Sequence, residues 1–361
     1  MRTNILQATA EYEAWLQRQI RLIRPDLKLK HQRMSDRAFP FLRATFYRWA
    51  QVWPDACSEL ASAPAVLGVG DLHIENFGTW RDLEGRLVWG VNDFDEATWL
   101  PYTNDLVRLA TSAILAIAEN DLSLDARDAV GAILEGYRES VERGGKPFIL
   151  AEHHLKLRAM AVERLRDPSE FWQKLDALPT WKSELPRAAA TALRQTLPER
   201  RLAYRVVHRV AGLGSVGRER FATLANWRGG HVAREAKTVA PSAWIWASDG
   251  KKTGLFYREI LDRAVRCDDP FLRIRSGWVV RRLAPDCSRI ELSDLPKVRE
   301  ELRLLYAMGW ETSNVHLGSR KAKAISSDLK KRKSDWLIGA ARNMADLVED
   351  DYKAWKHTAK D

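Results

Sequence analysis

Hydrophobic residues recur at helical spacing through most of the chain. Apolar positions that return every three or four residues are typical of helices that bury one face. Pro25 follows the first such stretch and is expected to end it. The expected helices cover residues 9–24, 41–52, 105–120, 126–144, 155–166, 185–197, 254–266 and the end of the chain from about Lys297.

Shorter runs of apolar and β-branched residues interrupt the helices in two places. These runs alternate or are continuously apolar, and turn residues such as the Asp-Leu-Glu-Gly and Gly-Gly segments separate them, which is typical of strands joined by hairpins. The expected strands lie in residues 66–73, 77–80, 86–94, 204–212, 218–226, 231–239, 271–275 and 277–284.

The order of elements predicts an α+β fold with two lobes. Helices, a hairpin, more helices, a small sheet and final helices do not alternate as a βαβ sheet would. We expect a helical lobe in residues 1–202 that carries the hairpin, and a small antiparallel, β-rich lobe in residues 203–285. Residues 286–361 are expected to return as helices to the helical lobe.

Composition indicates a folded globular chain and bears on the compartment in which it is expected. The 361 residues are 45% hydrophobic and 29% charged, which is ordinary for globular proteins. No run of about 18 apolar residues is present, so no membrane span is expected. The start of the chain lacks the pattern of a secretory signal. Three cysteines without metal spacing are expected to be reduced thiols in a cytoplasmic protein.

The net charge of +10 is compatible with a nucleic acid or a phosphate-bearing partner. Most lysines and arginines are spread over helical faces, where solvation explains them. Only residues 330–333 form a dense basic run, and this run lies within an expected helix. Nucleic-acid binding is therefore not expected, and a phosphate-bearing substrate accounts for the charge at least as well.

Polar side chains gather in the loop–hairpin–loop sequence GDLHIENFGTWRDLEGRLVWGVNDFDEA. Asp71, His73 and Asn76 follow the first strand, and Asp93 and Asp95 end the hairpin that folds back beside it. Single Asp and Asn residues are most often turn formers or helix caps. That interpretation is weaker here, because apolar strands hold several such groups in one unit.

Carboxylates and a carboxamide are oxygen ligands that suit Mg²⁺, which keeps water ligands and takes others from nucleotide phosphates. The sequence therefore predicts a magnesium site formed by Asn76, Asp93 and Asp95, with Asp93 and Asp95 as alternative main ligands. Asp105 heads the next helix, where we expect it to be either the N-cap or an acid of the first turn that also braces the loop.

A second motif lies in the small lobe, where Gly212, Gly214 and Gly217 have the spacing GxGxxG beside Ser215. The rival interpretation is a dinucleotide-binding fingerprint, which must open a helix packed on a parallel strand. Here strand-like segments follow the glycines. A glycine-rich hairpin tip covering nucleotide phosphates fits that context better.

Lys237 comes late on the third strand of this lobe, in a position that resembles that of the phosphate-binding lysine of protein kinases. A lysine on a strand is more often a solvated edge residue, but the glycines upstream favour the functional role. Glu259, on the following helix, is the expected ion-pair partner of Lys237, and Glu235 is a weaker candidate. Residues 279–286 are expected to form the hinge between the lobes, where backbone groups could meet adenine.

The first motif resembles a known catalytic loop. GDLHIEN resembles the catalytic loop of aminoglycoside phosphotransferases and other protein-kinase-like enzymes, and NDFDEA followed by NDLVRLA resembles their metal-binding segment. The resemblance implies that Asp71 accepts the proton of an attacking hydroxyl, that Asn76 and Asp93 hold Mg²⁺, and that His73 braces the loop. The chain departs from the pattern at Val69, where those enzymes usually have histidine.

The order of the two motifs along the chain also departs from that of the enzymes it resembles. In ordinary kinases the glycine-rich sheet precedes the catalytic loop, whereas here it follows by more than a hundred residues. The helix that ends at Val315–His316 resembles the one that usually runs directly before the catalytic loop. The chain thus resembles a circularly permuted, two-lobed protein-kinase-like fold.

Together with RMSDRAFPFLRATFYRWA near the start, this order resembles a bacterial family known as domain of unknown function 2252, over most of the chain. Arg43, within that segment, is a candidate for reaching a phosphate or the substrate. A basic residue at a helix start is more often simply solvated.

The resemblance implies an ATP- and Mg²⁺-dependent phosphotransferase that acts on a hydroxyl-bearing small molecule or protein. Three alternatives stay open: transfer of AMP on the same fold, a non-catalytic nucleotide-binding protein, and a metal-dependent phosphohydrolase. A binding-only protein would not need Asp71 as a base, and a phosphohydrolase would leave the glycines without a role.

Overall fold

The computed structural model describes residues 3–163, 167–248, 254–287 and 299–358. The chain is a mixed α+β protein in which helices predominate and the sheets are small and antiparallel. The helices are α1 Ile5–Gln19, α2 Arg24–Met34, α3 Ala38–Ala44, α4 Phe46–Ala56, α5 Ser58–Ala61, α6 Tyr102–Ala118, α7 Ala126–Arg143, α8 Leu150–His153, α9 Leu155–Glu163, α10 Pro168–Asp176, α11 Arg187–Thr196, α12 Ala243–Ala247, α13 Tyr257–Arg263, α14 Arg299–Leu317, α15 Ala322–Lys331 and α16 Trp336–Thr358, with one 3-10 turn, η1 Leu213–Ser215.

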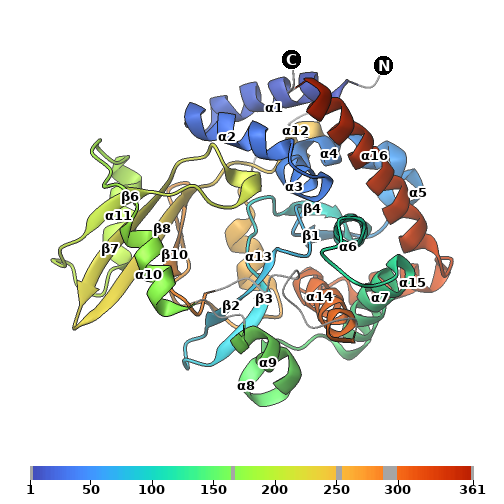
Figure 1. Cartoon of the computed structure of the whole chain (residues 1–361). Coiled ribbons are helices and arrows are strands. Elements are labelled where there is room, and N and C mark those ends of the chain that lie inside the picture. The colour runs from blue at the N-terminus through green and yellow to red at the C-terminus, as the bar shows by residue number, and fades with distance from the viewer. Residues whose placement is uncertain (1–2, 164–166, 249–253, 288–298, 359–361) are drawn as a thin grey trace.

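The strands form three antiparallel sheets, ordered β1-β4, β2-β3-β5 and β6-β7-β8-β10-β9. The five-stranded sheet lies on the side of the molecule opposite α7, α15 and α16 (Figure 1). Helix α2 lies beside the sheet, since Asp26 contacts His208 of β6 at 2.8 Å. The strands are β1 Ala65–Gly68, β2 Phe77–Arg81, β3 Leu87–Val91, β4 Thr98–Pro101, β5 Phe148–Ile149, β6 Arg205–His208, β7 Arg220–Trp227, β8 Gly230–Thr238, β9 Arg273–Arg275 and β10 Trp278–Leu283.

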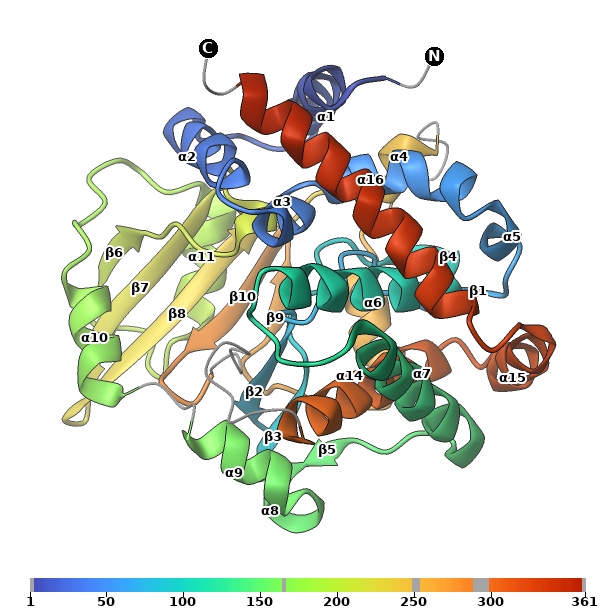
Figure 2. The same ribbon diagram turned by 45° about the vertical axis from the view of Figure 1, so that its right-hand side comes forward.

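One large hydrophobic core joins the N-terminal helices, the β1–β4 region and the helices α6, α7, α14 and α16. Figure 2 shows α6 lying between α16 and the β1–β4 pair. All seventeen residues of α6 but three are buried, because the helix has apolar neighbours on every side. This helix therefore gives the loops beside it a rigid support.

Helices α10 and α11 pack against the five-stranded sheet, although residues 1–202 were expected to belong to the helical lobe. Phe171 and Leu175 of α10 contact one cluster of sheet residues. Ala189, Ala192 and Leu193 of α11 contact a second cluster. Two helices that precede the sheet in sequence thus help to cover it.

The expected hairpins and the antiparallel small sheet are confirmed, but three local expectations are wrong. Pro25 does not end a helix: α1 ends at Gln19, and Pro25 lies in the first turn of α2, where its missing N–H costs nothing. The helix expected over residues 41–52 is split at Thr45, whose backbone leaves the helical region. Strand β4 was not expected. The expected helix start at Lys297 lies outside the described residues.

Two further observations concern the chain as a whole. None of the helices among the described residues has the length and apolar character needed to cross a bilayer. The three cysteines, Cys57, Cys267 and Cys287, are all free thiols in the described structure.

Candidate active site

The loop from Gly70 to Asn76 is held at its start by a buried carboxylate. Asp105, in the first turn of α6, accepts hydrogen bonds from the backbone N–H groups of Val69 (2.6 Å) and Gly70 (3.0 Å). The imidazole Nε2 of His316, near the end of α14, lies 3.0 Å from the same carboxylate. Asp105 therefore braces the loop, as expected, and His316 ties α14 to it.

Asp71 is oriented by a buried arginine. Arg108 donates its Nε to Asp71 Oδ1 at 2.9 Å and also donates a second, shorter bond to it from Nη2. The Arg108 guanidinium lies 5.0 Å from the ring centre of Phe46 and 4.9 Å from that of Trp49, which fixes its plane. Burial raises the pKa of Asp71, and the charge of Arg108 opposes this increase.

Asn76 connects the loop to the hairpin end. Its Nδ2 donates to the backbone carbonyls of Asp71 (3.2 Å) and Asp93 (3.0 Å), which turns both amide protons toward the protein and leaves Oδ1 as the atom that can ligate a cation. His73 accepts a hydrogen bond from the backbone N–H of Glu75 through Nδ1 (3.2 Å). The loop is thus internally braced at both His73 and Asn76.

Lys237 of β8 reaches across to the hairpin end and contacts two carboxylates. Its Nζ lies 3.1 Å and 2.9 Å from the two oxygens of Asp93, and 2.6 Å from Asp95 Oδ2. Lys237 of the small sheet and Asp93 of the hairpin are therefore in direct contact. The two residues come from parts of the chain that are 144 positions apart.

The two carboxylates differ in their surroundings. Burial would raise the pKa of Asp93, but Lys237 and Arg281 outweigh it and hold that pKa well below its usual range. Burial and the charge of Asp93 raise the pKa of Asp95. Both oxygens of Asp95 are buried, and neither accepts a well-formed hydrogen bond from the described residues, despite the short distance to Lys237.

The glycine-rich segment forms the loop between β6 and β7, an antiparallel pair, as expected. Gly212 and Gly217 have positive φ values, 71° and 98°, which favour glycine. Gly214 approaches Arg43 and the Gly70–Asn76 loop closely: a Cβ there would lie 2.9 Å from the carbonyl of Arg43 and 3.2 Å from Asp71 Oδ2. The glycine-rich loop therefore rests directly on Asp71.

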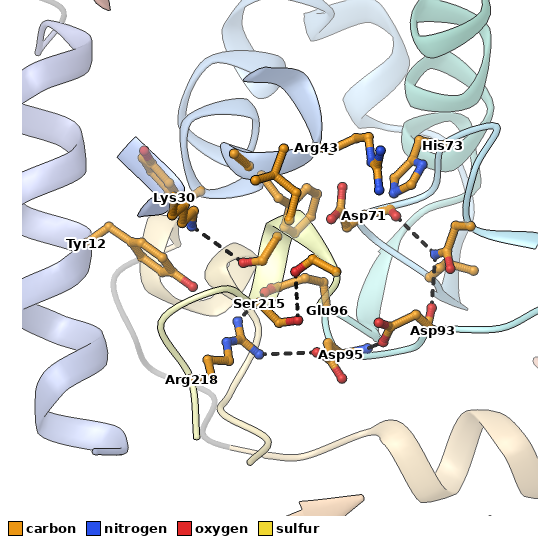
Figure 3. A pocket seen from close by; sticks show the side chains of 18 residues that line it. Tyr12, Lys30, Arg43, Asp71, His73, Asp93, Asp95, Glu96, Ser215 and Arg218 are labelled. Carbon is orange, nitrogen blue, oxygen red and sulfur yellow. Dashed lines mark hydrogen bonds and ion pairs between the residues drawn. The ribbon is translucent and has the colours of Figure 1, made fainter. Parts of the chain in front are cut away.

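A cavity of about 50 Å³ lies where these parts meet. Figure 3 shows Asp71, Asp93 and Asp95 on one side of it, with Ser215 and Arg218 on the other. Its lining combines both motifs with residues of α1–α4: Tyr12, Lys30, Arg43, Ala44, Phe46, Tyr47, Val69, Asp71, His73, Asn76, Asp93, Asp95, Glu96, Gly212, Leu213, Gly214, Ser215 and Arg218.

Three cations among the described residues line this cavity, with Lys237 close by. Arg43 forms an ion pair with Glu75, and Arg218 donates Nη2 to Glu96 Oε1 at 2.9 Å. Lys30 is buried and donates only a long bond, 3.4 Å, to the carbonyl of Gly214. Burial lowers the pKa of the Lys30 ammonium to about 8.

Of the remaining predicted site residues, some line the cavity and others lie away from it. Ser215 lines the cavity and accepts a hydrogen bond from Arg220 Nη2 at 2.6 Å. Gly217 does not line it, and a Cβ there would meet Leu27 instead. Residues 279–286 contact the hairpin: Arg81 Nε donates to Asp286 Oδ2 at 2.9 Å.

The ion pair expected between Lys237 and Glu259 is not formed, and that prediction is wrong. Glu259 is partly exposed on α13 and pairs with Arg263 one turn later, at 2.9 Å. Glu235, the weaker candidate, accepts hydrogen bonds from Arg209, Arg220 and Arg281. Lys237 pairs with the hairpin carboxylates because β8 directs it to Asp93 and Asp95.

Sequence reasoning did not identify Arg108, Lys30 or Arg218 as site residues. Arg108 had a signal, since it is a lone cation in the apolar sequence of α6, and a charged side chain there must be paired to be buried. Lys30 and Arg218 each lie among other basic residues in polar segments, and no local pattern distinguishes them from solvated ones.

Residues 22–174 match the model of a family described as "Uncharacterized protein conserved in bacteria (DUF2252)". The matched stretch contains the Gly70–Asn76 loop and the hairpin through Asp95, and it ends before the glycine-rich loop and Lys237. The expected resemblance to this family is confirmed over these residues. No curated protein and no solved structure matches the chain significantly.

Proposed function

We propose that this chain is a metal- and ATP-dependent phosphotransferase with a permuted, protein-kinase-like arrangement. The observation that carries the proposal is the meeting of two distant motifs at one cavity. Lys237 contacts Asp93 and Asp95, and Gly214 lies against Asp71. Unrelated turns would have no reason to converge in this way.

The residues present fit a magnesium ion. Asp93, Asp95 and the Oδ1 of Asn76 are oxygen donors of the kind that Mg²⁺ prefers. The buried oxygens of Asp95 lack well-formed hydrogen bonds among the described residues, and the Lys237 ammonium and the Arg218 guanidinium lie beside them. Among the described residues no three or more His, Cys, Asp and Glu side chains form a metal-binding group, so nucleotide phosphates and water would complete the ligand set. A bound magnesium would neutralise phosphate charge.

Asp71 has the properties of the base in this proposal. Arg108 fixes the orientation of its carboxylate through Oδ1, and burial raises its pKa, which increases its capacity to accept a proton. The second oxygen, Oδ2, faces Gly214 at the cavity. The hydroxyl of an acceptor would therefore give its proton to Oδ2.

The present arrangement is closed. A cavity of about 50 Å³ holds a few water molecules and is too small for a triphosphate. Nucleotide binding therefore requires the glycine-rich loop and Lys237 to move away from Asp71 and Asp93. Loop and lobe motions of this kind gate many transferase sites.

The path of the chain supports the permuted order. The end of α14 approaches β1, since the backbone N–H of Leu67 donates to Ser319 Oγ at 2.7 Å and His316 contacts Asp105. In the proposed arrangement this helix occupies the position directly before the catalytic loop in space, although it comes near the end of the sequence.

Product analysis tests the proposal. The protein is incubated with Mg²⁺ and ATP labelled separately at the γ- and α-phosphates, together with a cell extract from which nucleotides have been removed. Mass spectrometry should find the γ-label on an acceptor together with ADP. Transfer of the α-label with release of pyrophosphate would instead assign AMP transfer. Label transfer or phosphate release that is unchanged in Asp71→Asn would contradict the proposed base.

A further inference from the structure

A second cavity lies on the small sheet, on the side turned away from Lys237. Successive residues of a strand point to opposite faces, so Arg234 and Lys237 of β8 project to different sides of the sheet. The cavity has a volume of about 570 Å³, within the usual range of ligand sites. Its wall includes residues from β8, β9, β10 and the C-terminal end of α11.

Arginines dominate the wall of this cavity, which we call the arginine pocket. Its lining contains Arg234, Arg273, Arg275 and Arg282 and, among the described residues, no Asp or Glu. Arg282 is neutralised by Asp286 at 2.8 Å. Arg275 donates to the neutral amide of Gln195. The pocket therefore concentrates positive charge that the described residues neutralise at only one arginine.

Of the four arginines, Arg234 gives the strongest evidence for an anion site. Its side chain is buried, and it donates Nε to the carbonyl of Thr196 (2.8 Å) and Nη1 to that of Ala233 (2.9 Å). By donating to the carbonyl of Thr196, the last residue of α11, the Arg234 side chain caps the C-terminus of that helix, which is a structural role. That role does not explain why Arg282 packs on the same Phe271 ring, with the two guanidiniums 4.7 Å and 5.1 Å from its centre. Arg234 and Arg282 face each other across β8 and β10, so their like charges lie on one face of the sheet, where an anion would be stabilised.

Aromatic side chains complete the pocket. Trp172 stacks on His231 with ring centres 5.0 Å apart, and Trp227 and Phe271 lie in the same wall. Flat rings of this kind stack on nucleobases without strong sequence preference. Phosphate-binding guanidiniums beside aromatic faces match both ends of a nucleotide.

We propose that the arginine pocket binds a free nucleotide at a site distinct from the cleft of Asp71 and Asp93. Arg273, Arg275 and Arg234 would contact the phosphate, and the aromatic wall would contact the base. This inference does not depend on the function proposed for the cleft.

Binding calorimetry with AMP in EDTA tests the inference, because EDTA removes the metal on which the cleft is proposed to depend. Arg273 and Arg275 are exposed, so the double variant R273Q/R275Q should fold normally. It should weaken AMP binding at least about tenfold, which is ~1.4 kcal/mol. The charge-matched control R18Q/R342Q, exposed on α1 and α16, should bind AMP as the wild type does.

Three results would overturn the inference. Equal affinity for AMP in R273Q/R275Q and the wild type would place AMP elsewhere. Inorganic phosphate binding as tightly as AMP would remove the role of the aromatic wall. A single-stranded oligonucleotide binding more tightly than AMP, and losing affinity in R273Q/R275Q, would make the pocket a nucleic-acid contact instead. Turnover in the cleft should be unchanged in R273Q/R275Q, and this readout is independent of the binding result.

Discussion

Asp71 and Asp93 are neighbouring carboxylates whose surroundings shift their pKa values in opposite directions. Burial raises the pKa of Asp71, whereas Lys237 and Arg281 lower that of Asp93 despite its burial. Two acids separated in this way commonly divide the work of proton acceptance and charge binding. This division agrees with a base at Asp71 and a cation ligand at Asp93.

Replacing Asp71 by Asn should abolish turnover while preserving nucleotide binding. A carboxamide keeps the shape of the side chain but cannot accept the proton, and loss of a general base typically costs ~10²–10⁴-fold in rate. Steady-state kinetics and ATP binding measured on the same preparation check both parts. The exposed variant Asp346→Asn serves as the control. Wild-type rates in Asp71→Asn would remove Asp71 from the mechanism.

Lys30 should make stability depend on pH in the alkaline range. Burial lowers its pKa to about 8 from 10.5, so the unfolded chain binds more protons than the folded one between these values. The free energy of unfolding of the wild type, relative to that of Lys30→Met, should therefore rise between pH 8 and 10.5. The rise is at most ~1.4 kcal/mol per pH unit.

Urea unfolding of both proteins at several pH values measures this difference. Tyrosines of the unfolded chain titrate near the top of this range, and subtracting the variant removes their contribution. A difference that stays constant across the range would show that Lys30 is solvated in the folded protein.

At the scale of elements, the glycine-rich loop must lie against the Gly70–Asn76 loop without a side chain between them. Gly214→Ala would place a methyl group 2.9 Å from the Arg43 carbonyl and 3.2 Å from Asp71 Oδ2. The loop would be pushed outward, so turnover should fall at least ~10-fold with little change in global stability, since the loop lies at the cavity.

Gly131→Ala is the matched control for this substitution. Gly131 lies in α7, and a Cβ at this position would meet only open space. Alanine should therefore be tolerated there and should stabilise the helix by ~0.5–1 kcal/mol. Equal activity of Gly214→Ala and Gly131→Ala would show that contact between the two loops has no role in the reaction.

Elements with a clear period were predictable from sequence, and those decided by tertiary contacts were not. The β2–β3 and β7–β8 hairpins follow alternating residues and Gly-containing turns. Strand β4 has no such pattern, and it exists because β1 pairs with it. No proline or glycine at Thr45 indicates the helix break in the sequence. In the structure the Thr45 hydroxyl donates a hydrogen bond to the carbonyl of Phe41 at 2.7 Å.

The candidate site divides in the same way. Residues within one motif, such as Asp71, Asn76 and Asp93, could be identified because their spacing carries information. The partner of Lys237 could not, since it depends on how the sheet meets the hairpin. Spacing favoured Glu259, whereas the folded chain places Asp93 and Asp95 beside Lys237.

At the scale of the whole molecule, Lys237 is a cation that links the five-stranded sheet to the hairpin carboxylates. Lys237→Met would leave Asp93 and Asp95 without this charge, and removing one partner of a buried ion pair costs up to ~3–5 kcal/mol. The melting temperature of Lys237→Met should fall well below that of the wild type. Added Mg²⁺ should raise the melting temperature of Lys237→Met more than that of the wild type, because the ion replaces the ammonium.

Thermal unfolding with and without Mg²⁺ measures both effects. Lys174→Met is the control, because Lys174 is exposed on α10 and pairs only with Glu170 among the described residues. A Lys237→Met protein that Mg²⁺ stabilises no more than it stabilises Lys174→Met would argue against a magnesium site at Asp93 and Asp95.

In the proposed mechanism nucleotide phosphates and a metal ion meet at Asp93. Calorimetry of ATP binding in Mg²⁺ and in EDTA, with the wild type and Asp93→Ala, measures this directly. ATP should bind the wild type at least about tenfold more tightly in Mg²⁺ than in EDTA, and Asp93→Ala in Mg²⁺ should bind ATP as weakly as the wild type does in EDTA. Equal affinity of the wild type for ATP with and without Mg²⁺ would contradict it.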